Sequence, residues 1–206
     1  MRRVRGSGSN NALQNRPNAL RIIGGEWRGR RIRFPGLAGL RPTPDRVRET
    51  LFNWLAAVVA GSRCLDLFAG SGALGLEALS RGAACVCFLE REREAADCLR
   101  EMAMALAPER ASVLHADALA WLRGPATPFD VVFLDPPFGS ELLPAAMSAL
   151  ESGGWLAANA YIYLEAPATD GPPGLPANWT MHRSGRAGAV GYHLARRTGD
   201  LRVGAT

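Results

Sequence analysis

The stretch LDLFAGSGALGLEAL, residues 65–79, decides the fold expected of this chain. A short apolar run leads into a glycine-rich loop, and the loop opens directly into an apolar helical pattern. Gly70, Gly72 and Gly75 match G-x-G-x-x-G, which is typical of the first strand-to-helix turn of a nucleotide-binding α/β sheet. The stretch therefore predicts a ligand site at the end of this strand. The simpler alternative is that the glycines only make a tight turn.

Strand-like and helix-like segments alternate downstream of this loop. The segments expected to be strands are residues 64–68, 85–90, 112–116, 129–135 and 160–166. The segments expected to be helices are residues 74–81, 91–106, 118–123 and 140–151. Apolar strands that alternate with helices form a parallel, doubly wound sheet. Residues 179–197 then predict a closing hairpin. We therefore expect an α/β, Rossmann-like domain over residues 61–200.

Composition and charge limit the classes of partner. The chain has 206 residues, a formal net charge of +5 and a pI of about 9.6, and every basic residue other than histidine is arginine. This balance favours a polyanionic partner such as nucleic acid, although a merely basic protein would show it too. No apolar run has transmembrane length and no secretory signal is evident. We expect a cytoplasmic protein without a membrane segment.

The four cysteines do not suggest a metal site. Cys64, Cys85, Cys87 and Cys98 include no Cys-x-x-Cys pair and have no histidine at ligand spacing. Three of them fall in apolar strand-like runs, so we expect buried thiols in a reducing compartment. We expect no bound metal.

Three acidic residues narrow the choice of ligand. Asp66 lies just before the glycine loop, where it would repel a pyrophosphate but attract an amino group. Glu90 ends the next strand, at the distance expected of an acid that binds ribose hydroxyls. A ligand with adenosine and a charged amino-acid tail, but no phosphate, satisfies both, and S-adenosylmethionine is such a ligand. Asp117 would contact the adenine or cap the following helix. A nicotinamide cofactor remains the alternative.

The segment FDVVFLDPPF, residues 129–138, ends a buried strand on a carboxylate and two prolines. In a parallel sheet Asp135 would point toward the ligand. Its carboxylate and the Pro136 carbonyl, held in direction by Pro136 and Pro137, could each accept one N–H of a planar exocyclic amine. Phe138 offers a face for an unstacked base. The segment therefore predicts orientation of an amine for methyl transfer, whereas a proline-rich strand exit is the plain alternative.

The chain upstream of residue 61 predicts a small extension. Residues 20–35 are typical of two short strands around a glycine-rich turn, and residues 43–59 of a helix with Thr43 as N-cap and Pro44 in its first position. Residues 1–18 predict a flexible basic tail. We expect residues 19–60 to form a hairpin and helix that face RNA.

The chain resembles the bacterial 16S ribosomal RNA guanine-N2 methyltransferases. The segments that carry the resemblance are RIIGGEWRGRRI, LRPTPDRVRETLFNWL, CLDLFAGSGALGLEALSRGA, FLE and FDVVFLDPPF, within residues 21–196. The resemblance implies a class I fold with seven strands, the last antiparallel, and S-adenosylmethionine as donor. It implies a guanine in the small ribosomal subunit, or its late assembly intermediate, as acceptor, and we expect a monomer. It assigns the cofactor site to Asp66, Phe68, Gly70, Gly72, Glu90 and Asp117, and the catalytic motif to Asp135, Pro136, Pro137 and Phe138.

The N-terminal arginines are candidates for phosphate contacts. Arg28, Arg30 and Arg31 occur with Trp27 and glycines, as expected of a surface that binds RNA. The resemblance adds the expected substrate-binding residues Arg41, Thr43 and Arg46, near the mouth of the active site. A solvated strand edge is the alternative for the first three arginines.

Three other functions stay open. The Asp-Pro-Pro-Phe motif also occurs in adenine-N6 DNA methyltransferases, although 206 residues leave no room for a target-recognition domain. The glycine loop alone would suit a nicotinamide-dependent oxidoreductase. A catalytically silent RNA-binding protein is the third.

Overall fold

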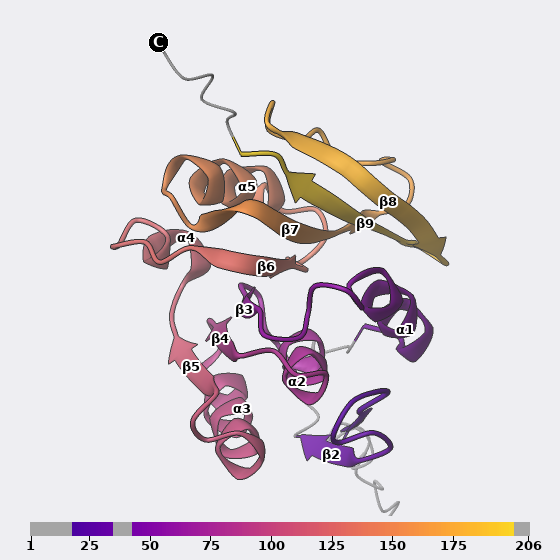
Figure 1. Cartoon of the computed structure of the whole chain (residues 1–206), viewed down its shortest axis with the longest axis vertical. Coiled ribbons are helices and arrows are strands. Elements are labelled where there is room, and N and C mark those ends of the chain that lie inside the picture. Colours follow the sequence, from indigo (N-terminus) through magenta and orange to yellow (C-terminus); the bar gives the residue numbers. More distant parts are fainter. Residues whose placement is uncertain (1–17, 35–42, 200–206) are drawn as a thin grey trace, which may run out of the picture.

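The computed structural model describes residues 18–34 and 43–199 (Figure 1). The expected basic tail, apart from Asn18, and Arg41 lie outside these residues. Within them, no helix is long and apolar enough to cross a membrane.

The main sheet has seven strands in the order β5-β4-β3-β6-β7-β9-β8. Its parallel part consists of β5 (Ala111–His115), β4 (Cys85–Glu90), β3 (Arg63–Asp66), β6 (Phe129–Leu134) and β7 (Leu156–Pro167). Beyond β7, the strand β9 (Val190–Arg197) runs antiparallel to it, and the edge strand β8 (Trp179–Ala187) pairs antiparallel with β9. The expected doubly wound, mostly parallel sheet is confirmed.

Helices cover both faces of this sheet (Figure 1). One face carries α1 (Asp45–Trp54), α2 (Ala73–Ser80) and α3 (Arg93–Leu106), and the other carries α4 (Ala118–Trp121) and α5 (Leu142–Ser152). Side chains of a strand alternate between the two faces of the sheet, so one strand contributes to the hydrophobic core on each face. On β6, Val131 and Phe133 join the core under α1 and α2, whereas Val132 and Leu134 join the core under α5.

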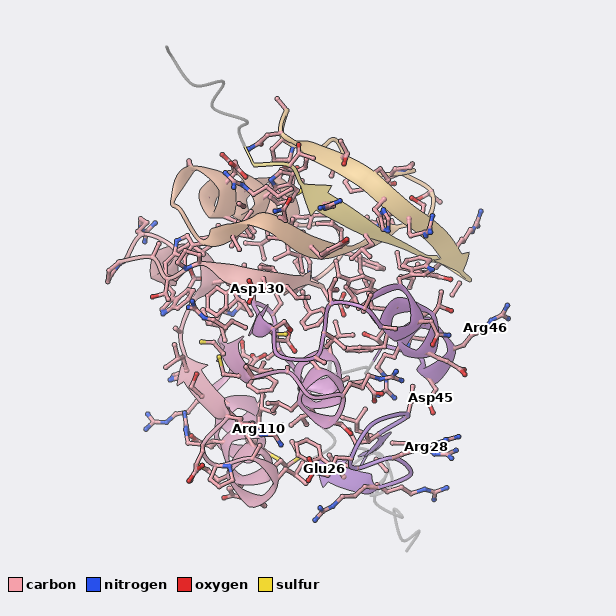
Figure 2. The ribbon with its side chains drawn as sticks, viewed as in Figure 1. Glu26, Arg28, Asp45, Arg46, Arg110 and Asp130 are labelled. Atoms are coloured by element: carbon pink, nitrogen blue, oxygen red, sulfur yellow. The ribbon has the colours of Figure 1, made fainter. Side chains whose placement is uncertain are left out.

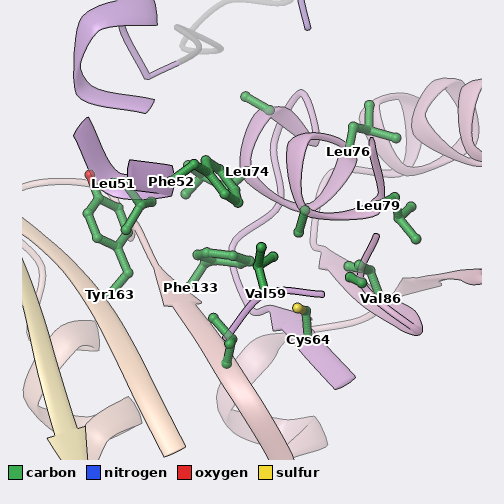
Figure 3. Packing of buried hydrophobic residues seen from close by; sticks show 14 of the residues in the cluster. Leu51, Phe52, Val59, Cys64, Leu74, Leu76, Leu79, Val86, Phe133 and Tyr163 are labelled. Atoms are coloured by element: carbon green, nitrogen blue, oxygen red, sulfur yellow. The ribbon is translucent and has the colours of Figure 1, made fainter. Parts of the chain in front are cut away.

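Aromatic contacts seat α1 on the middle of the sheet. Phe133 of β6 lies between Phe52 of α1 and Tyr163 of β7, with ring centroids 6.0 and 6.5 Å away (Figure 3). All three side chains are fully buried. This packing brings the start of α1 over the ends of β6 and β7.

The N-terminal extension is anchored on α2. Strands β1 (Asn18–Arg21) and β2 (Arg31–Phe34) pair as an antiparallel hairpin. The carboxylate of the fully buried Glu77 accepts hydrogen bonds from the backbone N–H groups of Ile23 and Gly24, both at 2.8 Å. Ile22 and Trp27 pack into the same core as the sheet. The hairpin is therefore held to the domain by buried polar contacts as well as by apolar ones.

Two local expectations differ from the structure. Helix α1 spans Asp45–Trp54, not residues 43–59, and Thr43 does not cap it: Pro44 is the N-cap residue and no side-chain cap bond forms. The N-cap prediction for Thr43 is wrong because its hydroxyl is engaged with carboxyl groups of the sheet instead. The four cysteines are free, but only Cys64 is fully buried.

Candidate active site

The candidate site lies at the point where the order of strands in the sheet reverses. Strand β3 has β4 on one side and β6 on the other, and this reversal point is where parallel α/β sheets bind ligands. Four neighbouring strands carry an acid at their carboxyl ends: Glu90 on β4, Asp66 on β3, Asp135 directly after β6 and Glu165 on β7. These four residues are called the acidic edge below.

Register and face bring the acids of this edge together. Asp66 pairs with Phe88 and Phe133, so Glu90 and Asp135 each lie two residues further along their strands. Leu134 pairs with Leu164, which places Glu165 level with Asp135. By strand alternation all four side chains project to the face covered by α1 and α2. The result is a row of carboxyl groups beside the glycine loop.

The glycine loop joins β3 to α2 in a conformation that suits glycine. Gly72 has φ of 75°, in the left-handed region that other residues rarely adopt. A Cβ on Gly75 would lie 2.2 Å from Cε1 of Phe88, so this glycine allows α2 to pack closely on β4. The Gly75 N–H in turn donates to Oδ2 of Asp66 at 3.0 Å. The loop and the first acid are thus held in one arrangement.

Glu90 is fixed beside the loop by two backbone donors. Its Oε2 accepts from the Gly70 N–H and its Oε1 from the Glu92 N–H, each at 2.7 Å. A carboxylate offers about four acceptor sites, so both oxygens can still accept from hydroxyl groups of a ligand. This arrangement is consistent with the expected role of Glu90 in binding ribose hydroxyl groups. Phe68, half-buried, lies on the loop between Asp66 and Gly70.

Asp66 is the acid whose surroundings best fit a cationic ligand group. It is only 3% exposed and takes part in none of the ion pairs among the described residues. Burial, with a further contribution from Glu90, raises the pKa of Asp66 to about 7. A buried acid without a cation gains from a positively charged ligand group, because the charge would stabilise its ionised form. The amino-acid end of S-adenosylmethionine carries such a group.

Asp117 follows β5 and caps a helix. Its Oδ1 accepts a hydrogen bond from the Ala120 N–H at 2.8 Å, which makes it the N-cap of α4. The capping role is therefore confirmed. The residue is exposed, so its second oxygen can also reach a ligand.

The Asp-Pro-Pro-Phe motif forms the exit from β6. Pro136 is buried, whereas Pro137 and Phe138 are exposed, and Phe138 is 47% exposed despite its apolar ring. The hydroxyl of Ser140 donates to the Pro137 carbonyl at 2.6 Å and holds the turn. Burial, Glu165 and Asp66 raise the pKa of Asp135 well above its usual range, against a lowering by the Thr43 hydroxyl. The motif thus places an acid and an open aromatic face side by side.

Thr43, which the resemblance led us to expect near the mouth of the active site, and Arg48, which the sequence did not single out, extend the site. Thr43 is buried, and its hydroxyl reaches both Asp135 and Glu165. The Arg48 guanidinium, only 1% exposed, donates from Nε to the Thr43 carbonyl at 3.1 Å and lies 3.6 Å from Glu77. A charged residue in an amphipathic helix pattern ordinarily faces water, so neither Arg48 nor Glu77 could be recognised as buried from the pattern. Glu165 had a weak signal, as the one acid in the apolar run YIYLEA.

The expected substrate arginines lie on the surface. Arg28, Arg30, Arg31 and Arg46 are exposed, and Figure 2 shows Arg28 and Arg46 extending outward on the same side of the molecule. None of the four forms an ion pair with another described residue. Trp27, however, is buried under the guanidinium of Arg110, 5.8 Å from its ring centroid, and so presents no face for a base.

No metal centre accompanies these residues. Among residues 18–34 and 43–199, no group of three or more His, Cys, Asp or Glu side chains could hold a metal ion.

The sheet order, the glycine loop and the acidic edge define a class I, S-adenosylmethionine-dependent methyltransferase. Residues 20–196 match the family model described as "Conserved hypothetical protein 95", and the chain belongs to that family. It is 50% identical to "Ribosomal RNA small subunit methyltransferase D" of Escherichia coli K12, over 86% of this chain and 90% of that relative. The protein of the same name from Haemophilus influenzae is 47% identical, over 86% and 95% of the two chains.

Solved structures agree with the fold. The yhhF protein of Escherichia coli superposes with a TM-score of 0.81 at 45% identity, over 89% of this chain and all of that chain. The Thermus thermophilus 16S rRNA N2 G1207 methyltransferase RsmC, solved with AdoMet and guanosine, gives a TM-score of 0.60 at 21% identity, over 89% of this chain and 50% of that chain. The second likeness concerns the fold alone.

Proposed function

We propose that this protein methylates the exocyclic N2 amine of a guanine in 16S rRNA of the small ribosomal subunit. The observation that carries the proposal is the position of the Asp-Pro-Pro-Phe motif, at the switch point and near the buried Asp66, which has no ion-pair partner in the described part of the chain. The curated relatives named small subunit rRNA methyltransferases, at 50% and 47% identity, support rRNA as substrate over DNA.

The donor site would be built from the loop and the first acids. Asp66 would attract the amino-acid end of S-adenosylmethionine, Glu90 would accept from its ribose hydroxyls and Asp117 would contact its adenine. Gly70, Gly72 and Phe68 would line the same loop. When bound, the cofactor supplies an electrophilic methyl group on a sulfonium.

The acceptor site would be built from the exit of β6. The Asp135 carboxylate and the Pro136 carbonyl would each accept one N–H of the guanine amine and aim its lone pair at the methyl group. Phe138 would stack on the base, which must be unpaired or flipped out to reach it. Pro136 and Pro137 restrict the backbone, so the acceptors are oriented before the base arrives. Most of the rate gain would then come from orientation and proximity.

The surface arginines would bind the phosphates around the target. Arg28, Arg30, Arg31 and Arg46 carry no internal acid partner among the described residues, so their charge is available to RNA. Arg41, beyond the described residues, is assigned to the same surface on the resemblance alone. We further propose a monomer that acts in the cytoplasm, on the small subunit or its late assembly intermediate.

A methyl-transfer assay tests the proposal. Labelled S-adenosylmethionine is offered with small ribosomal subunits from cells lacking the modification, with naked 16S rRNA and with duplex DNA, and the product nucleosides are identified by mass spectrometry. We expect N2-methylguanosine from the subunits. N6-methyladenine in DNA would move the protein to the alternative reaction. Absence of transfer, with binding of NAD but not of S-adenosylmethionine, would replace the proposal by an oxidoreductase.

A further inference from the structure

The hairpin of β8 and β9 carries positive charge to which the proposed methyl transfer assigns no task. Residues 179–199 contain four arginines, two histidines and no Asp or Glu. Arg197 is bound to Glu151 of α5. Arg183 and Arg196, in contrast, are exposed, and neither takes part in an ion pair within residues 18–34 and 43–199. The hairpin therefore presents two cations whose charge no acid of the described chain neutralises.

Strand pairing places these two arginines on one face of the sheet. Arg183 of β8 lies opposite Leu194 of β9, and Arg196 is two residues further along β9. Leu194 packs into the core under α1 and α2, so by strand alternation both arginines project to that face. As diagonal neighbours of an antiparallel pair, they are roughly 7–8 Å apart at the backbone. Two positive charges this close repel each other, and a bound polyanion would offset the repulsion.

Neutral groups hold the Arg196 side chain in place. Its Nη2 donates to Oδ1 of Asn159 at 3.2 Å, and its guanidinium lies over the Tyr161 ring of β7, 5.7 Å from the ring centroid. His182 of β8 meets the same ring edge-on, with the ring centroids 5.8 Å apart. These contacts orient the guanidinium without cancelling its charge. Less side-chain entropy is therefore lost when an anion binds to it.

A bulge in β8 gathers side chains on this face. The register between β8 and β9 shifts between Met181 and Arg183. In a regular strand, successive side chains point to opposite faces, whereas an extra residue at a bulge re-aims one of them. Here His182 reaches the ring of Tyr161, which packs against the core under α1, and Arg183 projects to the same face. Three neighbouring strands thus contribute to one basic and aromatic surface.

This surface is separate from the arginines already proposed to bind RNA. Figure 1 shows β8 and β9 near one end of the longest axis of the molecule, β2 near the other end, and α1 between them. Arg28, Arg30 and Arg31 belong to the hairpin that includes β2, and Arg46 belongs to α1. An RNA that follows these arginines past the candidate site would meet the β8–β9 hairpin further along.

We propose that Arg183 and Arg196, on the face of the β8–β9 hairpin that continues beyond α1, bind backbone phosphates of an rRNA segment away from the target guanine. The proposal rests on the proposed function, which supplies rRNA as the partner. A guanidinium matches the oxygens of a phosphate, and an RNA backbone offers the repeated negative charge that a hairpin with cations of one sign requires. Such contacts fix the orientation of the RNA and carry no sequence information.

The double variant Arg183→Ala/Arg196→Ala tests the surface. Filter binding of protein-free 16S rRNA at several salt concentrations should show an affinity about tenfold lower. The slope of log affinity against log salt should fall by about 1.4, about 0.7 for each phosphate contact to a single strand. With small subunits as substrate, KM should rise and kcat should change little, because neither arginine reaches the reacting groups. Arg183→Lys/Arg196→Lys should keep most of the slope, because it keeps both charges.

The matched control is Arg93→Ala/Arg100→Ala on α3. Both of its arginines are exposed and pair with Asp97, and the variant also loses two positive charges. It should reduce the slope much less than the hairpin variant does. Equal reductions in the two double variants would assign the effect to net charge alone, and the inference would fail.

The remaining outcomes separate this inference from the proposed function. An unchanged slope in the hairpin variant would make these arginines a solvated edge that deters aggregation, and the inference would fail. Weaker binding to intact subunits with unchanged binding to protein-free rRNA would indicate a ribosomal protein as partner and would also overturn it. If the slope falls as expected but no guanine is methylated, the proposed function fails and the phosphate-binding surface stands.

Discussion

Glu151 and the acids of the acidic edge differ in their ionic partners. Glu151 pairs with an arginine, whereas the acids of the acidic edge form no ion pair with another described residue. Glu151 on α5 accepts from the Asn178 amide at 2.6 Å, from the Trp179 indole at 2.7 Å and from the Arg197 guanidinium at 2.8 Å. These bonds lower its pKa to about 2, the bond from Arg197 contributing most. At the acidic edge, Asp66 and Asp135 have no cation partner among residues 18–34 and 43–199, and their pKa values are raised.

The difference distinguishes Glu151, an acid that stabilises the fold, from Asp66 and Asp135, acids in the candidate ligand site. Glu151, whose cation is supplied by Arg197, is ionised at neutral pH, and its bonds hold α5 against the last two strands. Buried acids without a cation destabilise the ionised folded state, which is tolerable where a ligand later supplies the charge. The same contrast applies to the arginines, since Arg197 is paired with Glu151 whereas Arg28 and Arg30 are exposed. The predictions below test this division, from the largest effect to the smallest.

Asp135→Ala should reduce turnover by about a thousandfold, because the amine would lose one of its two acceptors where charge develops. S-adenosylmethionine affinity should change by less than about twofold, since the donor site is built from other residues. Single-turnover methyl transfer and a binding titration measure the two. Near-normal turnover in this variant would contradict the assignment of Asp135 as a catalytic residue.

Glu151→Ala should lower the free energy of unfolding by about 2 kcal/mol, because the Arg197 guanidinium and two neutral donors lose their hydrogen bonds to Glu151. The lowered pKa of Glu151 means that its contribution is present above the ordinary pKa of a glutamate and is lost as the pH falls toward about 2. Urea unfolding at neutral and acid pH measures both effects. Asp97→Ala is the control, because its pair with Arg100 is exposed and should matter little. Equal losses in the two variants would overturn the structural role given to Glu151.

Asp66→Asn should abolish the pH dependence of S-adenosylmethionine affinity. In the unaltered protein Asp66 is neutral below a pKa of about 7 and ionised above it, so affinity should rise with pH by about tenfold between pH 6 and pH 8. Calorimetric titration at several pH values measures the dependence. Asp130→Asn is the control, because Asp130 is exposed and binds the Arg63 backbone N–H at the other end of the sheet (Figure 2). A dependence that persists without Asp66 would assign it to another group.

Arg30→Ala should weaken RNA binding a few-fold and reduce the slope of log affinity against log salt by about 0.7, the contribution of one phosphate contact to single-stranded RNA. Filter binding at several salt concentrations measures the slope. Arg93→Ala on α3 is the control, since Arg93 is also exposed but has an acid partner in the protein, with its Nε 4.0 Å from Oδ2 of Asp97. An unchanged slope for Arg30→Ala would indicate a solvated strand edge, the alternative left open by the sequence.

The sequence by itself determined the order of strands and helices, the glycine loop, and the acids at strand ends. These features are local: Asp66, Glu90 and Asp135 each directly follow or end an apolar strand, and a parallel sheet must gather such ends at one edge. The N-cap at Asp117 could likewise be predicted from the sequence, because its hydrogen bond joins residues only three positions apart.

Only the tertiary structure decided which groups meet at the catalytic carboxylate. Nothing in the sequence shows that β7 lies beside β6, so the pairing of Glu165 with Asp135 depends on long-range strand order. Thr43 has the local features of a helix cap, but the packing of Phe52 on Phe133 brings it over the sheet, where its hydroxyl meets two acids. Trp27, beside exposed arginines in sequence, is buried because the hairpin is anchored on α2. Local patterns determine where a strand ends, whereas packing between distant segments determines what stands next to that end.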